Sequence, residues 1–273
     1  MHDILIHVRG FETHTPAARF GVRLASRLHA AVTAVFACPD PVYVAPAYQP
    51  EALMVAITEN RRQLVRDAVQ AKQTFVDWAN AGGVTRAEWL VAQGPANDAL
   101  AQAATWHDLV VLDHGDVERD APSDISRLVL RVGIPCLVVP PHEPQSASFA
   151  RAAVAWNGSP EALRAIHSAL PFLRDKPVLL MHGKASDRYR GVDWQPPFNV
   201  CEYLRRRGVM VDMLEIEAKP EDAGAALLER AANFRADLLV MGAYGRSRFS
   251  EWMLGGATRH VLTFADLPVL MQH

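Results

Sequence analysis

Glycines near the end of the chain follow a buried apolar segment at a spacing that could build an anion-binding loop. Residues 242–258 read GAYGRSRFSEWMLGGAT and come directly after the apolar run 237–241. Glycines let a backbone turn tightly and approach a ligand closely, and the free N–H groups at the start of a helix attract negative charge. The same segment supplies hydroxyl groups and positive charge, at Ser247, Thr258, Arg246 and Arg248. It therefore predicts a site for phosphate or another anion.

The spacing of these glycines differs from that of the commoner nucleotide-binding motifs. The segment has neither the lysine of a P-loop nor the pattern G-x-G-x-x-G. One alternative is that the glycines only shape two turns. The order G-x-x-G, nine residues, then G-G resembles the phosphate loop of the universal stress protein family, in which the last pair is G-S or G-T. Gly242, Gly245 and Gly255 match that pattern, whereas Gly256 stands where the family has serine or threonine.

Short apolar runs alternate with segments of helical periodicity along the chain, which predicts an α/β fold with parallel strands and right-handed crossovers. The predicted strands are 3–8, 31–38, 88–91, 108–112, 135–139, 152–156, 177–181, 209–214, 237–241 and 268–271. The predicted helices are about 15–28, 51–80, 97–105, 125–132, 160–172, a short one ending at 207, 221–234 and 259–264. Ser159 is expected to cap the helix that begins at Pro160.

The chain contains an internal repeat. DLVVL at 108–112 is matched by DLLVM at 237–241, and IPCL at 134–137 by LPVL at 267–270. A polar, proline-bearing linker at 140–148 separates two units, which we predict at 1–141 and 150–273. This duplication resembles the tandem class of universal stress proteins. The resemblance implies two five-stranded parallel sheets of strand order 3-2-1-4-5, with helices on both faces, packed as an intramolecular pseudo-dimer through their last strands.

The two predicted units differ where the glycine loop stands. The first unit is four residues shorter there and reads DHGDVERD at 113–120, with four carboxylates and one glycine. Carboxylates would repel a triphosphate, and their spacing is not that of an EF-hand, so we interpret this loop as a solvated surface. The first unit is therefore predicted to be degenerate and to serve as the packing partner of the second.

In the second unit, the resemblance implies a nucleotide site built from three strand ends. Loops at the point where the winding of an open sheet reverses face each other, which here are the loops at Asn157 and Gly242. The family has an aspartate, near the adenine and ribose, where Asn157 stands; the first unit has Arg9. The family often has His-Val after its second strand, where this chain has His182 and Gly183, so the apolar wall against adenine is expected to be missing. The predicted site is Asn157, Gly183, Gly242, Gly245, Arg246, Ser247, Gly255, Gly256, Ala257 and Thr258.

Composition excludes several other classes of function. The net charge of −2 gives no electrostatic argument for nucleic acid or an anionic membrane. No apolar run approaches the roughly 20 residues of a membrane span, and the first residues do not read as a signal peptide. Cys38, Cys136 and Cys201 have no CxxC spacing and the histidines are dispersed, so we expect a cytoplasmic protein without disulfides or a metal site.

The sequence thus favours an adenine-nucleotide-binding stress protein that holds ATP or AMP, with or without Mg²⁺, in its second unit. No nucleophile–base pair, G-x-S-x-G motif or Walker lysine is present, so no catalytic residue is predicted and ATP hydrolysis would be slow and incidental. The alternative is an interaction module that keeps the fold for a protein partner while its nucleotide site decays. A homodimer is compatible with either hypothesis.

Overall fold

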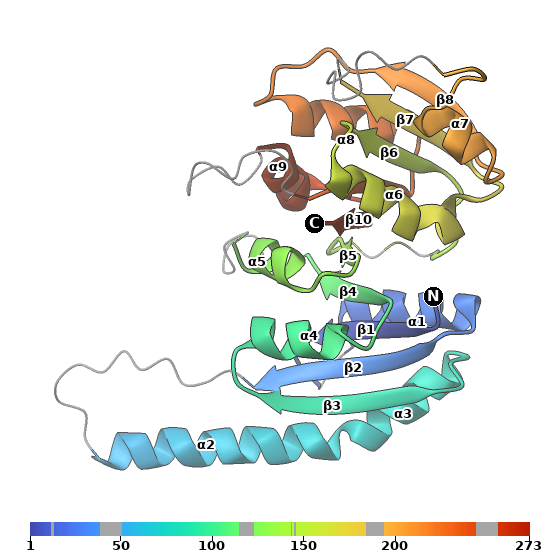
Figure 1. The fold of residues 1–273 in the computed structure, drawn as a ribbon. Helices are drawn as coiled ribbons and strands as arrows, with labels where there is room; N and C mark the ends of the chain where they lie inside the picture. Colours follow the sequence, from blue (N-terminus) through green and yellow to red (C-terminus); the bar gives the residue numbers. More distant parts are fainter. Residues whose placement is uncertain are drawn as a thin grey trace.

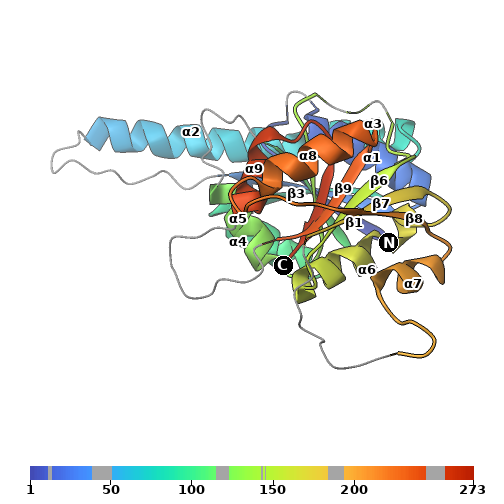
Figure 2. The ribbon, with the colours of Figure 1, turned by 90° about the horizontal axis from the view of Figure 1, so that it is seen from above.

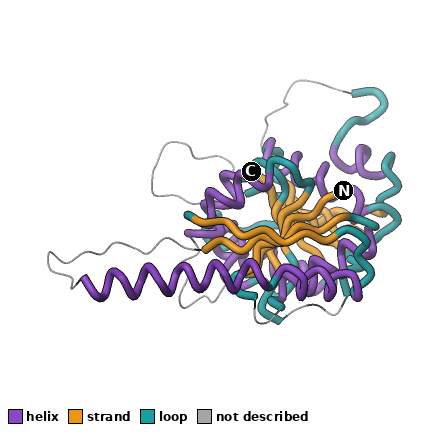
Figure 3. Tube along the Cα trace, turned by 90° about the horizontal axis from the view of Figure 1, so that it is seen from below, coloured by secondary structure: helices purple, strands orange, loops and turns teal. Residues whose placement is uncertain are grey.

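Ten strands form one continuous sheet at the centre of the protein in a computed structural model, with helices on both faces (Figures 1 and 3). The structure describes residues 1–11, 14–38, 51–114, 123–142, 144, 146–183, 194–243 and 256–273. The strands are β1 (Asp3–Val8), β2 (Ala31–Cys38), β3 (Ala87–Gln93), β4 (Leu109–Asp113), β5 (Cys136–Val139), β6 (Ala152–Trp156), β7 (Pro177–His182), β8 (Met210–Glu215), β9 (Leu238–Gly242) and β10 (Val269–Gln272).

The strand order is β3-β2-β1-β4-β5-β10-β9-β6-β7-β8. Each half, β1–β5 and β6–β10, is parallel and has the order 3-2-1-4-5, which confirms the predicted fold class. The halves meet through their last strands, because β10 pairs antiparallel with β5 in the register Val269↔Val138. The pseudo-dimer is therefore a single sheet, with β3 and β8 at its two edges (Figure 1).

The helices cover the two faces of this sheet in separate groups (Figures 1 and 2). One face carries α1 (Pro16–Leu28), α2 (Glu51–Gln70), α3 (Lys72–Ala81), α6 (Pro160–Leu173) and α7 (Val200–Arg205). The other face carries α4 (Ala96–Ala104), α5 (Ser123–Arg131), α8 (Ala223–Asn233) and α9 (Gly256–Phe264). The predicted cap of α6 is confirmed, because the hydroxyl of Ser159 accepts the N–H of Ala162 at 3.1 Å. Every helix in the described ranges is too short or too polar to span a bilayer.

The linker between the halves ends in the core. Phe149 is 2% exposed, and its ring lies 5.9 Å from that of Phe20 in α1 and 5.1 Å from that of Phe172 in α6. One aromatic side chain thus joins helices from both halves on the same face of the sheet. We predicted a polar linker up to residue 148, but Ala147 is also buried.

The single helix predicted over 51–80 is wrong in one respect, because the helix breaks at Ala71 into α2 and α3. The indole N–H of the buried Trp89 in β3 donates to the carbonyl of Ala68 at 2.7 Å. The carbonyl of Ala68, in the last turn of α2, therefore accepts a hydrogen bond from the sheet instead of one from the next turn of the helix. The break depends on a contact between residues 21 positions apart and has no local sequence signal.

Candidate functional site

The carboxyl ends of β6, β7 and β9 surround a cavity in the C-terminal half. Strand β6 lies between β7 and β9, and the winding reverses at β6, so the loops after β6 and β9 leave the sheet side by side. Ligands in open α/β sheets bind outside such a reversal. The cavity measures about 360 Å³. It is lined by Ala155, Trp156, Asn157, Met181, His182, Gly183, Ile216, Ala218, Pro220, Ala223, Leu227, Met241, Gly242, Gly256, Ala257 and Thr258.

The cavity brings together part of the site predicted from the sequence. Asn157, Gly183, Gly242, Gly256, Ala257 and Thr258 all line it, although they come from three strand ends and the start of α9. The other predicted residues, Gly245, Arg246, Ser247 and Gly255, lie outside the residues that the structure describes. The described part of the predicted site is thus contiguous in space.

The apolar wall that we expected to be missing is present, but it comes from other elements. Ile216 follows β8, and Pro220 and Leu227 belong to the segment that leads into α8 and to α8 itself. Met181 and Met241, at the ends of β7 and β9, close the cavity from the sheet side. The apolar character of the cavity wall therefore does not depend on the residue at position 183. In the sequence, this wall corresponds to Ile216, directly after the third strand of the second half, and to Leu227 in the helix that follows.

Polar side chains at the cavity are few. Asn157 is exposed, and its side-chain oxygen accepts the N–H of Ser159 at 3.0 Å, which fixes the carboxamide at the end of β6. His182 Nδ1 lies 3.1 Å from the carbonyl of Gly183, and Thr258 is 4% exposed. Among the described lining residues there is no lysine, arginine, carboxylate or cysteine. The lining is suited to a neutral, largely apolar group.

Helix α9 begins at this cavity, which gives one side of it a partial positive charge. Gly256, Ala257 and Thr258 form the first turn of α9, and no acidic side chain lies in that turn. The first N–H groups of a helix have no partner within the helix and stabilise an anion there. A ligand with an apolar ring and an anionic group matches both parts of this cavity.

Gly242 holds the end of β9 against the start of α6. A Cβ atom at this position would lie 2.5 Å from the amide nitrogen of Ala162 and 2.7 Å from the carbonyl carbon of Glu161, so only glycine fits. Glu161 sits in the first turn of α6. Burial works against its charge, but hydrogen bonds from its own N–H and from Ser159 hold the pKa of Glu161 below its usual range. The carboxylate at the start of α6 thus belongs to α6 itself.

The equivalent position in the N-terminal half carries Asp113 at the end of β4. Its carboxylate accepts the N–H of Ala17, in the first turn of α1, at 2.7 Å. Burial raises the pKa of Asp113, against hydrogen bonds from Thr15 and Ala17 and the charge of Arg9. We interpreted 113–120 as a solvated acidic surface, and for Asp113 this is wrong, because the carboxylate is needed at the helix start. The rest of that loop, 115–120, lies outside the described residues.

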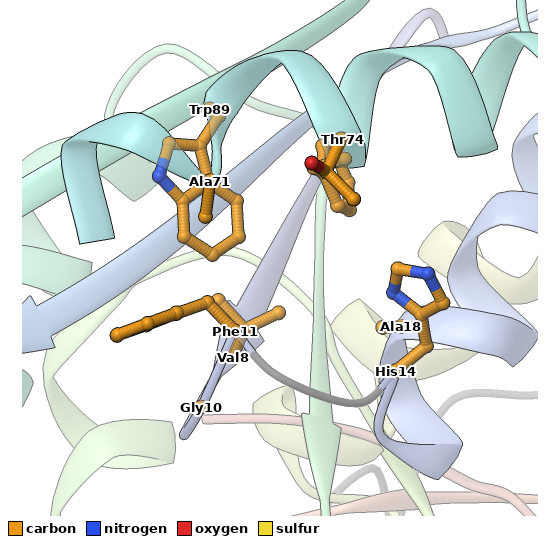
Figure 4. A pocket seen from close by; sticks show the side chains of 9 residues that line it. Val8, Gly10, Phe11, His14, Ala18, Ala71, Thr74 and Trp89 are labelled. Atoms are coloured by element: carbon orange, nitrogen blue, oxygen red, sulfur yellow. The ribbon is translucent and has the colours of Figure 1, made fainter. Parts of the chain in front are cut away.

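A second, much smaller pocket lies in the N-terminal half between α1, α3 and β3 (Figure 4). Its volume is about 10 Å³, room for a single water, and the side chains of Phe11, His14 and Trp89 surround it. His14 also stacks on Trp78 with ring centroids 3.6 Å apart. Burial, together with the charge of Arg19, lowers the pKa of His14. The pocket is a packing gap rather than a ligand site.

Metal and thiol chemistry find no support in the described part of the chain. That part holds no group of three or more His, Cys, Asp or Glu side chains placed to bind a metal ion. The three cysteines are buried and free of disulfides, and burial raises the pKa of Cys136 to about 12. Such a thiol stays protonated and unreactive at neutral pH.

Comparisons with known proteins agree with the fold. A sequence model of the Universal stress protein family matches residues 148–273. A search of curated proteins gives no match. A universal stress protein from Archaeoglobus fulgidus DSM 4304 is similar in structure over 98% of this chain and 95% of its own, at 13% identity and a TM-score of 0.66. A functionally unknown protein from Pseudomonas aeruginosa PAO1 is similar over 100% of this chain and 92% of its own, at 12% identity and a TM-score of 0.58.

The two structural neighbours are too distant in sequence to show more than the fold, but each covers both halves of this chain. The family model covers the half that contains the cavity. Residues 148–273 therefore belong to the universal stress protein family, and the first half of the chain repeats the same fold in tandem.

Proposed function

We propose that the C-terminal half binds an adenine nucleotide, ATP or AMP, in the cavity at the ends of β6, β7 and β9. The observation that carries this proposal is the cavity itself: about 360 Å³, at the reversal of the sheet, with apolar walls on one side and the start of α9 on the other. A nucleotide has the same two parts, a flat base that gains from burial and an anionic phosphate chain.

The base would lie in the apolar part of the cavity. Met181, Ile216, Leu227 and Met241 offer aliphatic and thioether surface, and methionine adapts its shape to an aromatic ring. The amide group of Asn157 and the imidazole of His182 are the side chains at the rim that can hydrogen-bond a base or ribose. Because none of these groups is a carboxylate, the affinity is expected to depend on burial more than on charge.

The phosphates would extend towards the first turn of α9. Gly256, Ala257 and Thr258 supply N–H groups there, and a Cβ at Gly256 would meet no atom within 4 Å, so the backbone is open to a ligand. Gly245, Arg246, Ser247 and Gly255 remain predicted phosphate contacts. Any Mg²⁺ would be held by the phosphates, since the described lining supplies no carboxylate for it.

The proposed role is binding, as in a regulatory stress protein, rather than catalysis. A general base must lie within hydrogen-bond reach of the proton it removes. In the described lining, His182 is the one imidazole, and its Nδ1 already lies against the carbonyl of Gly183. We therefore assign no catalytic residue.

Calorimetric titration of the full chain with ATP and with AMP tests the proposal. We compare the wild type with Ala218→Trp, which places a large ring at an exposed position of the cavity wall. The matched control is Ala225→Trp, the same change at an exposed alanine of α8 that does not line the cavity. We expect wild type and Ala225→Trp to bind one nucleotide and Ala218→Trp to bind none. Equal binding by all three proteins would place the nucleotide elsewhere.

The loop variant Gly245→Val with Gly255→Val tests the phosphate contacts separately. If these glycines shape a phosphate cradle, the variant should lose affinity for ATP more than for AMP, because ATP carries more of its charge in the phosphate chain. No binding by the wild type would reject the nucleotide proposal. It would leave the interaction module as the function of the fold.

A further inference from the structure

Helix α2 extends beyond the body of the protein. Its C-terminal part lies along the edge of the sheet near β3, whereas its first turns project past the sheet (Figures 1 and 2). The corresponding crossover in the C-terminal half, between β7 and β8, contains the six-residue helix α7. The projecting part of α2, residues 51–60, which we name the arm, therefore has no counterpart in the described part of the second half.

The arm continues the apolar stripe with which α2 packs on its own sheet. Ala68 is fully buried, and Leu64 and Val65 pack against the core. Leu53 and Ile57 lie on the same stripe, because residues three, four, seven and eight positions apart share one face of a helix. Yet Leu53 is 46% exposed. Apolar residues of the stripe thus occur again past the sheet, beyond the polar positions Asn60 and Arg61.

An isolated arm of this length would be only marginally helical in water. Helices shorter than about 12–15 residues gain little from propensity alone and depend on burial of an apolar face. A partner that covers Leu53 and Ile57 would supply that burial. The question is which partner the arm is built to accept.

Charge along α2 favours an identical helix running in the opposite direction. The first ten residues, 51–60, hold two glutamates and no basic residue, whereas 61–70 hold three arginines and one aspartate. An antiparallel copy would place each acidic end over a basic end, while a parallel copy would oppose like charges. Within one chain, Glu59 and Arg66 pair at 2.8 Å on the exposed side of the helix.

We propose that the α2 arm is an interaction surface for a second copy of this chain, joined through antiparallel α2 helices. This contact is separate from the β5–β10 junction, which is already used within the chain. It would lie on the first half, away from the cavity of the second half, so two chains could associate and leave both cavities accessible (Figure 1).

Sedimentation of the full-length protein over a range of concentrations tests this proposal. We expect a monomer–dimer equilibrium in the wild type, and a dimer dissociation constant raised about tenfold or more by Leu53→Gln, which removes an apolar side chain from each copy. The matched control is Val55→Gln, which changes a 63% exposed residue on the opposite face of the same turn. The control should dimerise like the wild type.

A charge variant tests the antiparallel arrangement. Glu59→Arg combined with Arg66→Glu keeps the ion pair within one helix but removes the charge difference between its two ends. We expect this variant to dimerise more weakly and with less dependence on salt. A wild type that stays monomeric would overturn the proposal, and so would equal dimerisation by Leu53→Gln and Val55→Gln. A fall in the melting temperature of monomeric Leu53→Gln would also overturn it, because the stripe would then be covered within its own chain.

Discussion

The ends of β4 and β9 occupy equivalent places in the two halves, and they meet the following helices in opposite ways. In the N-terminal half, Asp113 reaches from the strand to the start of α1 and accepts the N–H of Ala17. In the C-terminal half, Gly242 brings the bare backbone against the start of α6, and Glu161 of that helix supplies the carboxylate. At both helix starts an acidic side chain thus accepts the N–H of the second helical residue, but it comes from the strand in one half and from the helix in the other.

This exchange teaches what allows a strand end to form part of a cavity wall. Where the strand supplies the carboxylate, the side chain of Asp113 stands at the strand end and is directed to the start of α1, with the charge of Arg9 nearby. Where the helix supplies it, the strand end can be glycine, and the backbone at Gly242 becomes part of a cavity wall. The two halves therefore differ at one position in the same place of the fold.

The largest loss of stability should come from adding a side chain at Gly242. In Gly242→Ala the new methyl group would lie 2.5 Å from the backbone nitrogen of Ala162, which cannot move aside without shifting α6. We expect the free energy of unfolding, measured in urea by circular dichroism, to fall by about 3 kcal/mol. Gly256→Ala is the control, since its methyl group would meet no atom within 4 Å. Similar losses in both variants would contradict this account of Gly242.

Removal of the Asp113 carboxylate in the N-terminal half should lower the free energy of unfolding by a smaller amount. Asp113→Ala leaves the N–H of Ala17 without its acceptor and should lower the free energy of unfolding by about 2 kcal/mol. Asp113→Asn retains an acceptor of similar shape and should lose clearly less. If the two variants were equally unstable, the hydrogen bond to α1 would not be the role of this side chain.

Asn157→Asp sharpens the comparison at the proposed ligand site. A charged acceptor forms stronger hydrogen bonds than a neutral one, by about 1 kcal/mol, so nucleotide affinity should rise by up to roughly tenfold. Arg9→Asn, which gives the first half the residue that stands at position 157, should add no second site, because Asp113 rather than glycine stands at the end of β4. Titration gives affinity and stoichiometry together. A stoichiometry of two in Arg9→Asn would show that the first half is not degenerate.

The smallest expected effect is a change in the stability of the protein with pH. Burial raises the pKa of Asp113 in the folded protein, so the folded state binds this proton more tightly than the unfolded chain does. The resulting contribution to stability is complete below the ordinary pKa of 3.8 and is lost as pH rises through the folded pKa. The wild type should therefore gain stability relative to Asp113→Asn as pH falls from 7 towards 4. A difference that stays constant over this range would contradict the buried environment of Asp113.

Local patterns in the sequence were sufficient for the fold. Runs such as 237–241 are apolar on both faces and too short for a helix, which fits only a central parallel strand, and the matched runs at 108–112 and 237–241 revealed the repeat. The cap at Ser159 depends on the residues that follow it directly, and it was predicted correctly. The break of the helix at Ala71 was not predicted, because the hydrogen bond that Trp89 donates to Ala68 comes from another element, β3.

For the candidate site, the sequence by itself determined where the glycines stand, and the strand order implied by the resemblance to the universal stress protein family indicated which strand ends would face them. Asn157, Gly242 and Gly256 were placed together on that basis, and they line one cavity. Only the tertiary structure decided what forms its walls and where Asp113 points. Ile216 and Leu227 become a wall because α8 packs beside α9 and β6, and Asp113 accepts an N–H of α1 because that helix starts beside β4. Both depend on contacts between residues distant in the chain, and local preference contains no information about them.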